Sequence, residues 1–287
     1  MRRGGHDGRG RRHALVLVLG LMSACAAAPR LTLPATNDTL VLPAGQFRLA
    51  FPPREAEAAG MVRLAVEHAM PRLARWGAFE APVTLVIHPD HESLEVAANR
   101  SGYDFLRVWA RDEQIEIQSP RTWTPSGAAP AQVDEVLLHE LTHSLMFQRV
   151  GDARTRMHKA IPLWFREGMA YFTAEQGYRA LSLEDLARYL HEHPTVDPVA
   201  QADRIYREDN AVVYSAAYHA FTFLVRRYGE DAVRDMLQRM RQGAQFPEAF
   251  EHAVGIPVDA FLRDFHRYVY LRGFKGGRIT RPVTADP

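Results

Sequence analysis

The sequence is nearly free of cysteine, since Cys25 is the only one among 287 residues. A single cysteine cannot form a disulfide within the chain, so no internal disulfide stabilises the fold. The hydrophobic fraction of 47% is ordinary for a globular protein. We therefore expect a packed hydrophobic core to hold the structure together.

The sequence also lacks an excess of either charge, with 35 Lys and Arg against 34 Asp and Glu. Residues 1–24 contain five arginines and one aspartate, which leaves the rest of the chain at a net charge of −3. No long run of basic residues follows Arg12. A mildly acidic chain without a basic patch does not favour a polyanion, so we expect no nucleic-acid partner.

Long hydrophobic runs are missing as well, apart from the short run ALVLVLGLM at residues 14–22. This run is too short for a stable membrane span, and it follows a group of arginines and precedes small residues. The pattern predicts a signal peptide over residues 1–24 and an exported protein.

Cys25 directly follows the predicted signal peptide, in the tetrapeptide Met22-Ser23-Ala24-Cys25. This arrangement resembles a bacterial lipobox, in which a thiol at the cleavage point accepts a lipid. It predicts a lipid anchor at Cys25 that holds the protein on a membrane of the bacterial cell envelope, facing the periplasm or the exterior. The alternative is ordinary cleavage after Ala26-Ala27-Ala28, which would remove Cys25.

The remaining chain divides into three predicted regions. Residues 25–43 are rich in proline and threonine near their end and predict a tether. Residues 44–276 form the predicted folded domain, with a strand-rich part at 44–130 and a helical part at 131–276, and residues 277–287 form a tail. Strands followed by helices predict an α+β fold, with a small mixed β-sheet in its first part.

Hydrophobic periodicity and turn residues locate the individual elements. Strands are expected at 46–51, 82–87, 106–110 and 114–118. Helices are expected at 54–77, 91–99, 131–149, 162–176, 182–193, 210–228, 230–242 and 257–271.

The helix expected at 131–149 contains the sequence His139-Glu140-Leu141-Thr142-His143. Residues four apart lie on one helical face, so both imidazoles can reach one ion. Glu140 projects to the side of the pair, where it can contact a metal-bound water without binding the metal. This spacing suits zinc-dependent hydrolysis, and two unpaired imidazoles in so apolar a helix would be costly.

A third metal ligand is expected in the segment PLWFREGMAYF at residues 162–172. Glu167 lies on a helical face with Leu163 and Tyr171, and this face can pack against the helix of His139. Gly168 removes a side chain where two helices must approach closely. A solvent-exposed Glu167 would fit poorly with its large apolar neighbours. The prediction is one Zn²⁺ per chain, held by three protein ligands with a fourth position open.

The segments HELTH and LWFREGMAYF resemble the gluzincin clan of zinc metallopeptidases, and the peptidase MA-like family in particular. The segments DEQIEIQSP and YSAAYHAFTFLVRRYG are also similar to that family, and the resemblance covers residues 82–228. It implies His139, His143 and Glu167 as zinc ligands, Glu140 as the catalytic base, and a site in the cleft between the two parts of the domain.

The resemblance also implies a donor from a late helix that stabilises the oxyanion of the transition state. Tyr214, Tyr218 and His219 are the candidates, and Tyr214 is the one we favour. The strand at 114–118 is expected to be either the sheet edge along which a peptide aligns or an interior strand.

Three functions remain open from the sequence. The first is an exported, membrane-tethered zinc peptidase acting on a peptide or protein substrate. The second is a non-catalytic zinc-binding envelope lipoprotein, and the third is a zinc hydrolase of a non-peptide amide or ester. The presence of Glu140 favours a catalytic site, because a structural zinc site does not need it.

Overall fold

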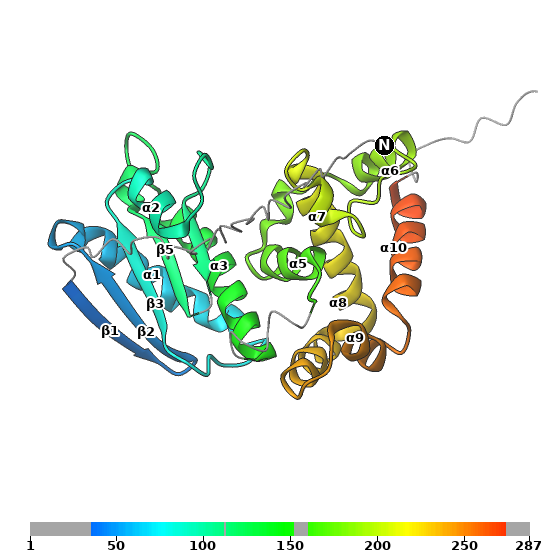
Figure 1. Cartoon of the computed structure of the whole chain (residues 1–287), viewed down its shortest axis with the longest axis horizontal. Coiled ribbons are helices and arrows are strands. Elements are labelled where there is room, and N and C mark those ends of the chain that lie inside the picture. Colours follow the sequence, from blue (N-terminus) through cyan, green and yellow to red (C-terminus); the bar gives the residue numbers. More distant parts are fainter. Residues whose placement is uncertain (1–35, 112, 152–159, 274–287) are drawn as a thin grey trace, which may run out of the picture. The chain divides into compact units, whose positions relative to one another are not determined.

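The computed structural model describes residues 36–111, 113–151 and 160–273, and Figure 1 shows their arrangement along the chain. The predicted signal peptide, Cys25 and the tail at 277–287 lie outside these residues. Within the described residues, no helix is both long enough and apolar enough to cross a membrane.

The first part of the chain forms a mixed five-stranded sheet with the strand order β1-β2-β3-β5-β4. The outer pairs β1–β2 and β4–β5 are antiparallel, and β2–β3 and β3–β5 are parallel. The strands are β1 (Thr36–Leu42), β2 (Gly45–Phe51), β3 (Val83–His88), β4 (Val108–Arg111) and β5 (Gln114–Gln118). The predicted mixed sheet is therefore confirmed.

Residues 36–42, which the sequence predicts to be part of a tether, instead form strand β1. This strand pairs with β2 along its whole length, from Thr36 opposite Phe51 to Leu42 opposite Gly45. Leu40 is buried against the core, whereas Val41 on the other face is exposed. The composition indicates a tether, but a complete hairpin partner supplies backbone hydrogen bonds that composition does not reveal.

Strand β5 is an interior strand, and β4 is the strand at that edge of the described sheet. Of the two alternatives for residues 114–118, the interior one is therefore correct. Ile115 and Ile117 of β5 are buried in the main core, and the intervening residues face the opposite side of the sheet, where α2 (His91–Ala98) lies.

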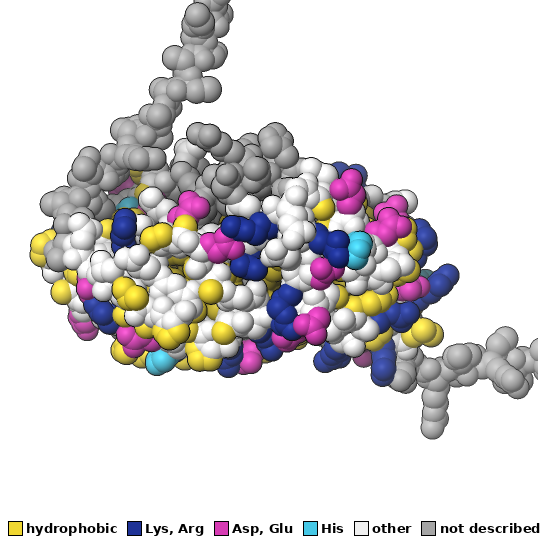
Figure 2. All heavy atoms as spheres, turned by 90° about the horizontal axis from the view of Figure 1, so that it is seen from below, with side chains coloured by type: hydrophobic (Ala, Val, Ile, Leu, Met, Phe, Trp, Pro, Cys, Tyr) yellow, Lys and Arg dark blue, Asp and Glu magenta, His cyan; other side chains and the backbone are white. Residues whose placement is uncertain are grey.

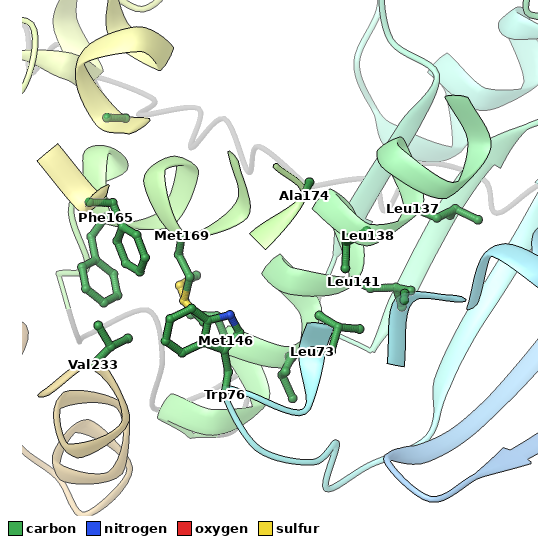
Figure 3. Packing of buried hydrophobic residues seen from close by; sticks show 14 of the residues in the cluster. Leu73, Trp76, Leu137, Leu138, Leu141, Met146, Phe165, Met169, Ala174 and Val233 are labelled. Carbon is green, nitrogen blue, oxygen red and sulfur yellow. The ribbon is translucent and has the colours of Figure 1, made fainter. Parts of the chain in front are cut away.

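The core side of the sheet is covered by α1 (Ala56–Leu73) and α3 (Pro130–Val150). Buried residues of these helices, of the sheet and of the later helices belong to one continuous hydrophobic cluster. Figure 3 shows this cluster from close by, with Leu73, Leu141, Met169 and Val233 among its members. The helices that carry the site described below therefore share one packed core.

The second part of the described chain is helical, as predicted. Its helices are α5 (Leu163–Thr173), α6 (Leu183–Glu192), α7 (Ala202–Ile205), α8 (Asn210–Arg241), α9 (Phe246–Val254) and α10 (Val258–Gly273). Short 3₁₀ turns occur at η1 (Pro53–Glu55), η2 (Pro120–Thr122) and η3 (Gln176–Arg179). Helix α8 is interrupted at Gly229, whose φ of 83° separates the two helices that the sequence predicts there.

Basic and acidic side chains are interspersed on the face shown in Figure 2, with apolar side chains between them. Some charged residues of the protein pair along single helices, as Arg239 does with Asp235.

Candidate active site

Helix α3 holds three of the predicted site residues. It begins at Pro130, whose fixed φ and missing N–H suit the first helical position. Leu137, Leu141 and Leu145 are completely buried and fix the rotation of the helix about its axis. The side chains of His139 and His143 keep 13% and 11% of their surface exposed, so both can be reached from outside the core.

Helix α5 holds Glu167 and packs against both α3 and α8. Phe165 and Met169 are completely buried. A Cβ atom on Gly168 would overlap the backbone carbonyl oxygen of Ala217 in α8. The sequence indicates a close approach of two helices at Gly168. The absence of a side chain there allows α5 to approach α8. This contact holds α5 in place beside α3.

The three predicted ligands converge in the structure. The Nε2 atoms of His139 and His143 are 3.1 Å apart. The Oε2 atom of Glu167 lies 3.6 Å from Nε2 of His139 and 3.5 Å from Nε2 of His143. Around a tetrahedral zinc with bonds of about 2.0–2.1 Å, ligand atoms are separated by roughly 3.3 Å. Two imidazoles and one carboxylate at these separations fit a zinc ion.

The charge of Glu167 supports this assignment. Burial raises the pKa of Glu167, but the adjacent His143 and His139 lower it more, and the result is a pKa well below the usual range. Burial lowers the pKa of His139, and Glu167 and Glu140 more than offset that effect and raise it overall. Glu167 therefore carries a negative charge at neutral pH, as a metal-ligating carboxylate requires.

Glu140 lies beside the ligand set and is not a member of it. Its Oε2 atom accepts a hydrogen bond of 3.0 Å from the backbone N–H of Ala110 in the edge strand β4. Burial raises the pKa of Glu140 above its ordinary value, although His139 and His143 act in the opposite direction. A carboxylate with a raised pKa is better suited to accept a proton near neutral pH.

Tyr214 of α8 is connected to this site through Tyr171 of α5. The Tyr171 ring stacks on Tyr214 with centroids 5.3 Å apart, and it also approaches His139 edge-on with centroids 5.3 Å apart. The hydroxyl of Tyr214 donates to the hydroxyl of Tyr206 at 3.1 Å. Burial, together with the charge of Glu167, raises the pKa of Tyr214 far above its usual range.

The other two candidate donors lie in different surroundings. The Nε2 atom of His219 is 2.7 Å from the carbonyl oxygen of Leu181, and burial lowers the pKa of this imidazole. A neutral His219 therefore donates its Nε2–H to that carbonyl. The hydroxyl of Tyr218 lies against Gly177, where a Cβ atom would overlap it.

Three residues near the site were not assigned a role there by the sequence. Gln176 contacts His139, and Glu135 contacts Gln176. Tyr171 packs against His139, and burial raises the pKa of its phenol to about 12, assisted by Glu167. Tyr171 was detectable as a residue on the face of Glu167, one helical turn away. No signal indicates Gln176, because it belongs to a short turn without a motif.

The chain is 21% identical over 205 residues to the uncharacterized protein YhcO of Bacillus subtilis, and the match covers 66% of this chain and 58% of that protein. It therefore spans less than two thirds of the relative's length. A crystal structure of Legionella pneumophila aminopeptidase A in complex with aspartic acid is similar with a TM-score of 0.49 and 17% identity, over 81% of this chain and 28% of that one.

The family comparison covers the segment that carries the candidate site. The family model described as Peptidase MA superfamily matches residues 124–271, which is more than half of the chain. The matched segment includes His139, Glu140, His143, Glu167 and Tyr214. This protein belongs to the Peptidase MA superfamily.

Proposed function

We propose that this protein is a zinc-dependent metallopeptidase of the gluzincin type that hydrolyses peptide bonds. The convergence of His139, His143 and Glu167 at tetrahedral separations, with Glu140 beside them, is the observation that carries this proposal. A zinc ion held there supplies a coordinated water with a pKa lowered to about 7 and polarises the substrate carbonyl.

Glu140 is the proton carrier in this proposal. Its carboxylate accepts a proton from the attacking water and delivers it to the nitrogen of the leaving amine. The hydrogen bond from Ala110 holds the Glu140 carboxylate beside the edge strand. The raised pKa of Glu140 suits both the uptake and the release of a proton. The same hydrogen bond joins Glu140 to β4, so the position of the base relative to the sheet edge is fixed.

The peptide substrate aligns along β4 in this proposal. The Ala110 N–H points toward Glu140 in α3, so the backbone on this side of β4 adjoins the catalytic base. An extended peptide that adds to β4 as a further strand passes close to Glu140 and gains main-chain hydrogen bonds without requiring one particular sequence. This assigns to β4 the role that the sequence considered for residues 114–118.

The zinc peptidase, the zinc hydrolase of a non-peptide amide or ester, and the non-catalytic zinc-binding lipoprotein give different results in one assay. Incubation of the purified, zinc-loaded protein with a peptide library, and in parallel with ester and non-peptide amide substrates, distinguishes the three functions. We expect cleavage of peptides. Turnover of only the non-peptide substrates would favour the zinc hydrolase of another amide or ester, and no turnover of any substrate would favour the non-catalytic lipoprotein.

Tyr214 is proposed to stabilise the oxyanion that forms during attack. Tyr214→Phe should lower kcat by about 10²–10³ with little change in KM, because the phenol donates to a charge that exists only in the transition state. The zinc content should remain at the wild-type level. Tyr218→Phe and His219→Ala are the comparison variants. Full activity of Tyr214→Phe with a large loss in either comparison variant would transfer the role to that residue.

The protein is proposed to act outside the cytoplasm, anchored to an envelope membrane through a lipid on Cys25. Mass spectrometry of the mature N-terminus should find Cys25 as the first residue with an added lipid mass. Cys25→Ala should release the protein from the membrane fraction. A mature chain that begins downstream of Cys25, for example at Pro29, would contradict lipidation.

A further inference from the structure

A chain of partly buried polar groups connects Glu135, in the first half of α3, to the metal-ligating His139. The Nδ1 atom of His139 lies 2.8 Å from Oε1 of Gln176, and Nε2 of Gln176 donates to Oε1 of Glu135 at 3.0 Å. Gln176 keeps only 4% of its surface exposed. Glu135 precedes His139 by one helical turn, so the chain begins and ends on the same face of α3.

The donors and acceptors in this series of hydrogen bonds fix the position of each shared proton. A carboxylate only accepts hydrogen bonds, so the NH₂ group of Gln176 must face Glu135, and its carbonyl oxygen must face His139. A carbonyl also only accepts, so Nδ1 of His139 must carry the ring hydrogen. In the neutral ring, Nε2 of His139 then presents its lone pair toward Glu167 and His143, as a metal ligand must.

Glu135 is itself held by two further groups of the same turn. The Tyr178 hydroxyl donates to its Oε2 atom at 2.7 Å, and the Arg179 guanidinium contacts its Oε1 atom at 2.9 Å. Gln176, Tyr178 and Arg179 all belong to the four-residue turn η3, which begins two residues after the end of α5. Gly177, between them, is seated against Tyr218 of α8. The turn therefore presents three groups to α3 as one unit.

We propose that Gln176, held by Glu135, is a positioning residue that fixes the tautomer and orientation of His139 for zinc binding. This inference rests on the proposed zinc function of the site. Its effect is on zinc affinity, since an imidazole held in the correct tautomer binds the ion without first losing freedom of rotation. Loss of such a partner of a metal ligand typically weakens metal binding about 10–100-fold.

The test measures the zinc dissociation constant by competition with a chelator, together with the visible spectrum of the cobalt-substituted protein. Gln176→Leu replaces the amide with an apolar side chain of somewhat shorter reach and removes both hydrogen bonds. We expect zinc binding to weaken about 10–100-fold and the cobalt spectrum to change. Gln176→Met is the second variant, in case the leucine variant does not fold.

A double variant tests the direction of the hydrogen bonds that link Glu135, Gln176 and His139. In Glu135→Gln with Gln176→Glu, the carboxylate and the amide exchange places, so the carboxylate accepts directly from Nδ1 of His139. Zinc affinity should return to within a few-fold of wild type, because the tautomer is again fixed. A purely structural contribution of Gln176 would not be rescued by this exchange.

Gln148→Leu is the matched control. Gln148 is also a buried glutamine, lies on α3 with His139, and accepts from the backbone N–H groups of Glu80 and Ala81 at 2.8 and 2.9 Å. The Gln148→Leu protein should bind zinc as tightly as wild type, even if it unfolds at a lower temperature.

Three outcomes would overturn the proposal: an unchanged zinc affinity in Gln176→Leu or Gln176→Met, an equal loss in Gln148→Leu, or no rescue in the double variant. The zinc measurement uses no substrate, so its result is independent of peptide hydrolysis. A protein that requires Gln176 for zinc but cleaves no peptide would contradict only the proposed function.

Discussion

Glu140→Gln should leave one zinc per chain and abolish peptide hydrolysis. The amide of glutamine can still accept the hydrogen bond from Ala110, so the local structure is preserved. It cannot take up a proton from the attacking water, however. General-base catalysis typically contributes about 10²–10⁴ to the rate, and kcat should fall by that factor or more. Steady-state kinetics with a cleaved peptide, together with elemental analysis, measure both quantities.

Glu57→Gln provides the matched control for this experiment. Glu57 is a largely exposed glutamate of α1 that pairs with Arg121, and it makes no contact with the ligand set. It should retain full activity and zinc content. An undiminished rate in Glu140→Gln would show that another group moves the proton.

His143→Ala should lose most of its zinc and, with it, all measurable hydrolysis. Removal of Nε2 from the set leaves only His139 and Glu167, and two protein ligands hold zinc far more weakly than three. The protein should still fold, because α3 remains attached to the core through buried residues such as Leu141 and Leu145. Elemental analysis after dialysis and circular dichroism measure these outcomes.

The exposed histidine His252 offers a control on α9. Its ring lies near Asp235 and remote from the ligand set. His252→Ala should bind zinc at wild-type stoichiometry. Retention of one zinc per chain in His143→Ala would contradict the ligand assignment.

The site helices were predictable because their signals are local. The sequence predicts helices at 131–149 and 162–176, and α3 and α5 occupy Pro130–Val150 and Leu163–Thr173. A helix fixes the relation of residues three and four apart, so His139 and His143 could be placed on one face from spacing alone. Glu167 was identifiable because its large neighbours could only be accommodated in a core.

The features that the sequence did not reveal depend on distant pairing. Strand β1 owes its structure to the hairpin with β2, and the edge position of β4 follows from the order of the whole sheet. Neither can be inferred from the alternation of residues within one segment. The contact between Gln176 and His139 joins positions 37 residues apart. Only the folded chain brings the turn η3 onto the start of α3.

The proposed zinc-dependent hydrolysis is tested most directly by a peptide-library digest with the zinc-loaded protein, with the same sample after removal of metal with a chelator, and after zinc is restored. Mass spectrometry of the products detects each new peptide terminus. We expect cleavage products with the loaded protein, none after metal removal, and the same products once zinc returns. Cleavage that continues without metal, or no cleavage by a fully loaded protein, would contradict zinc-dependent hydrolysis.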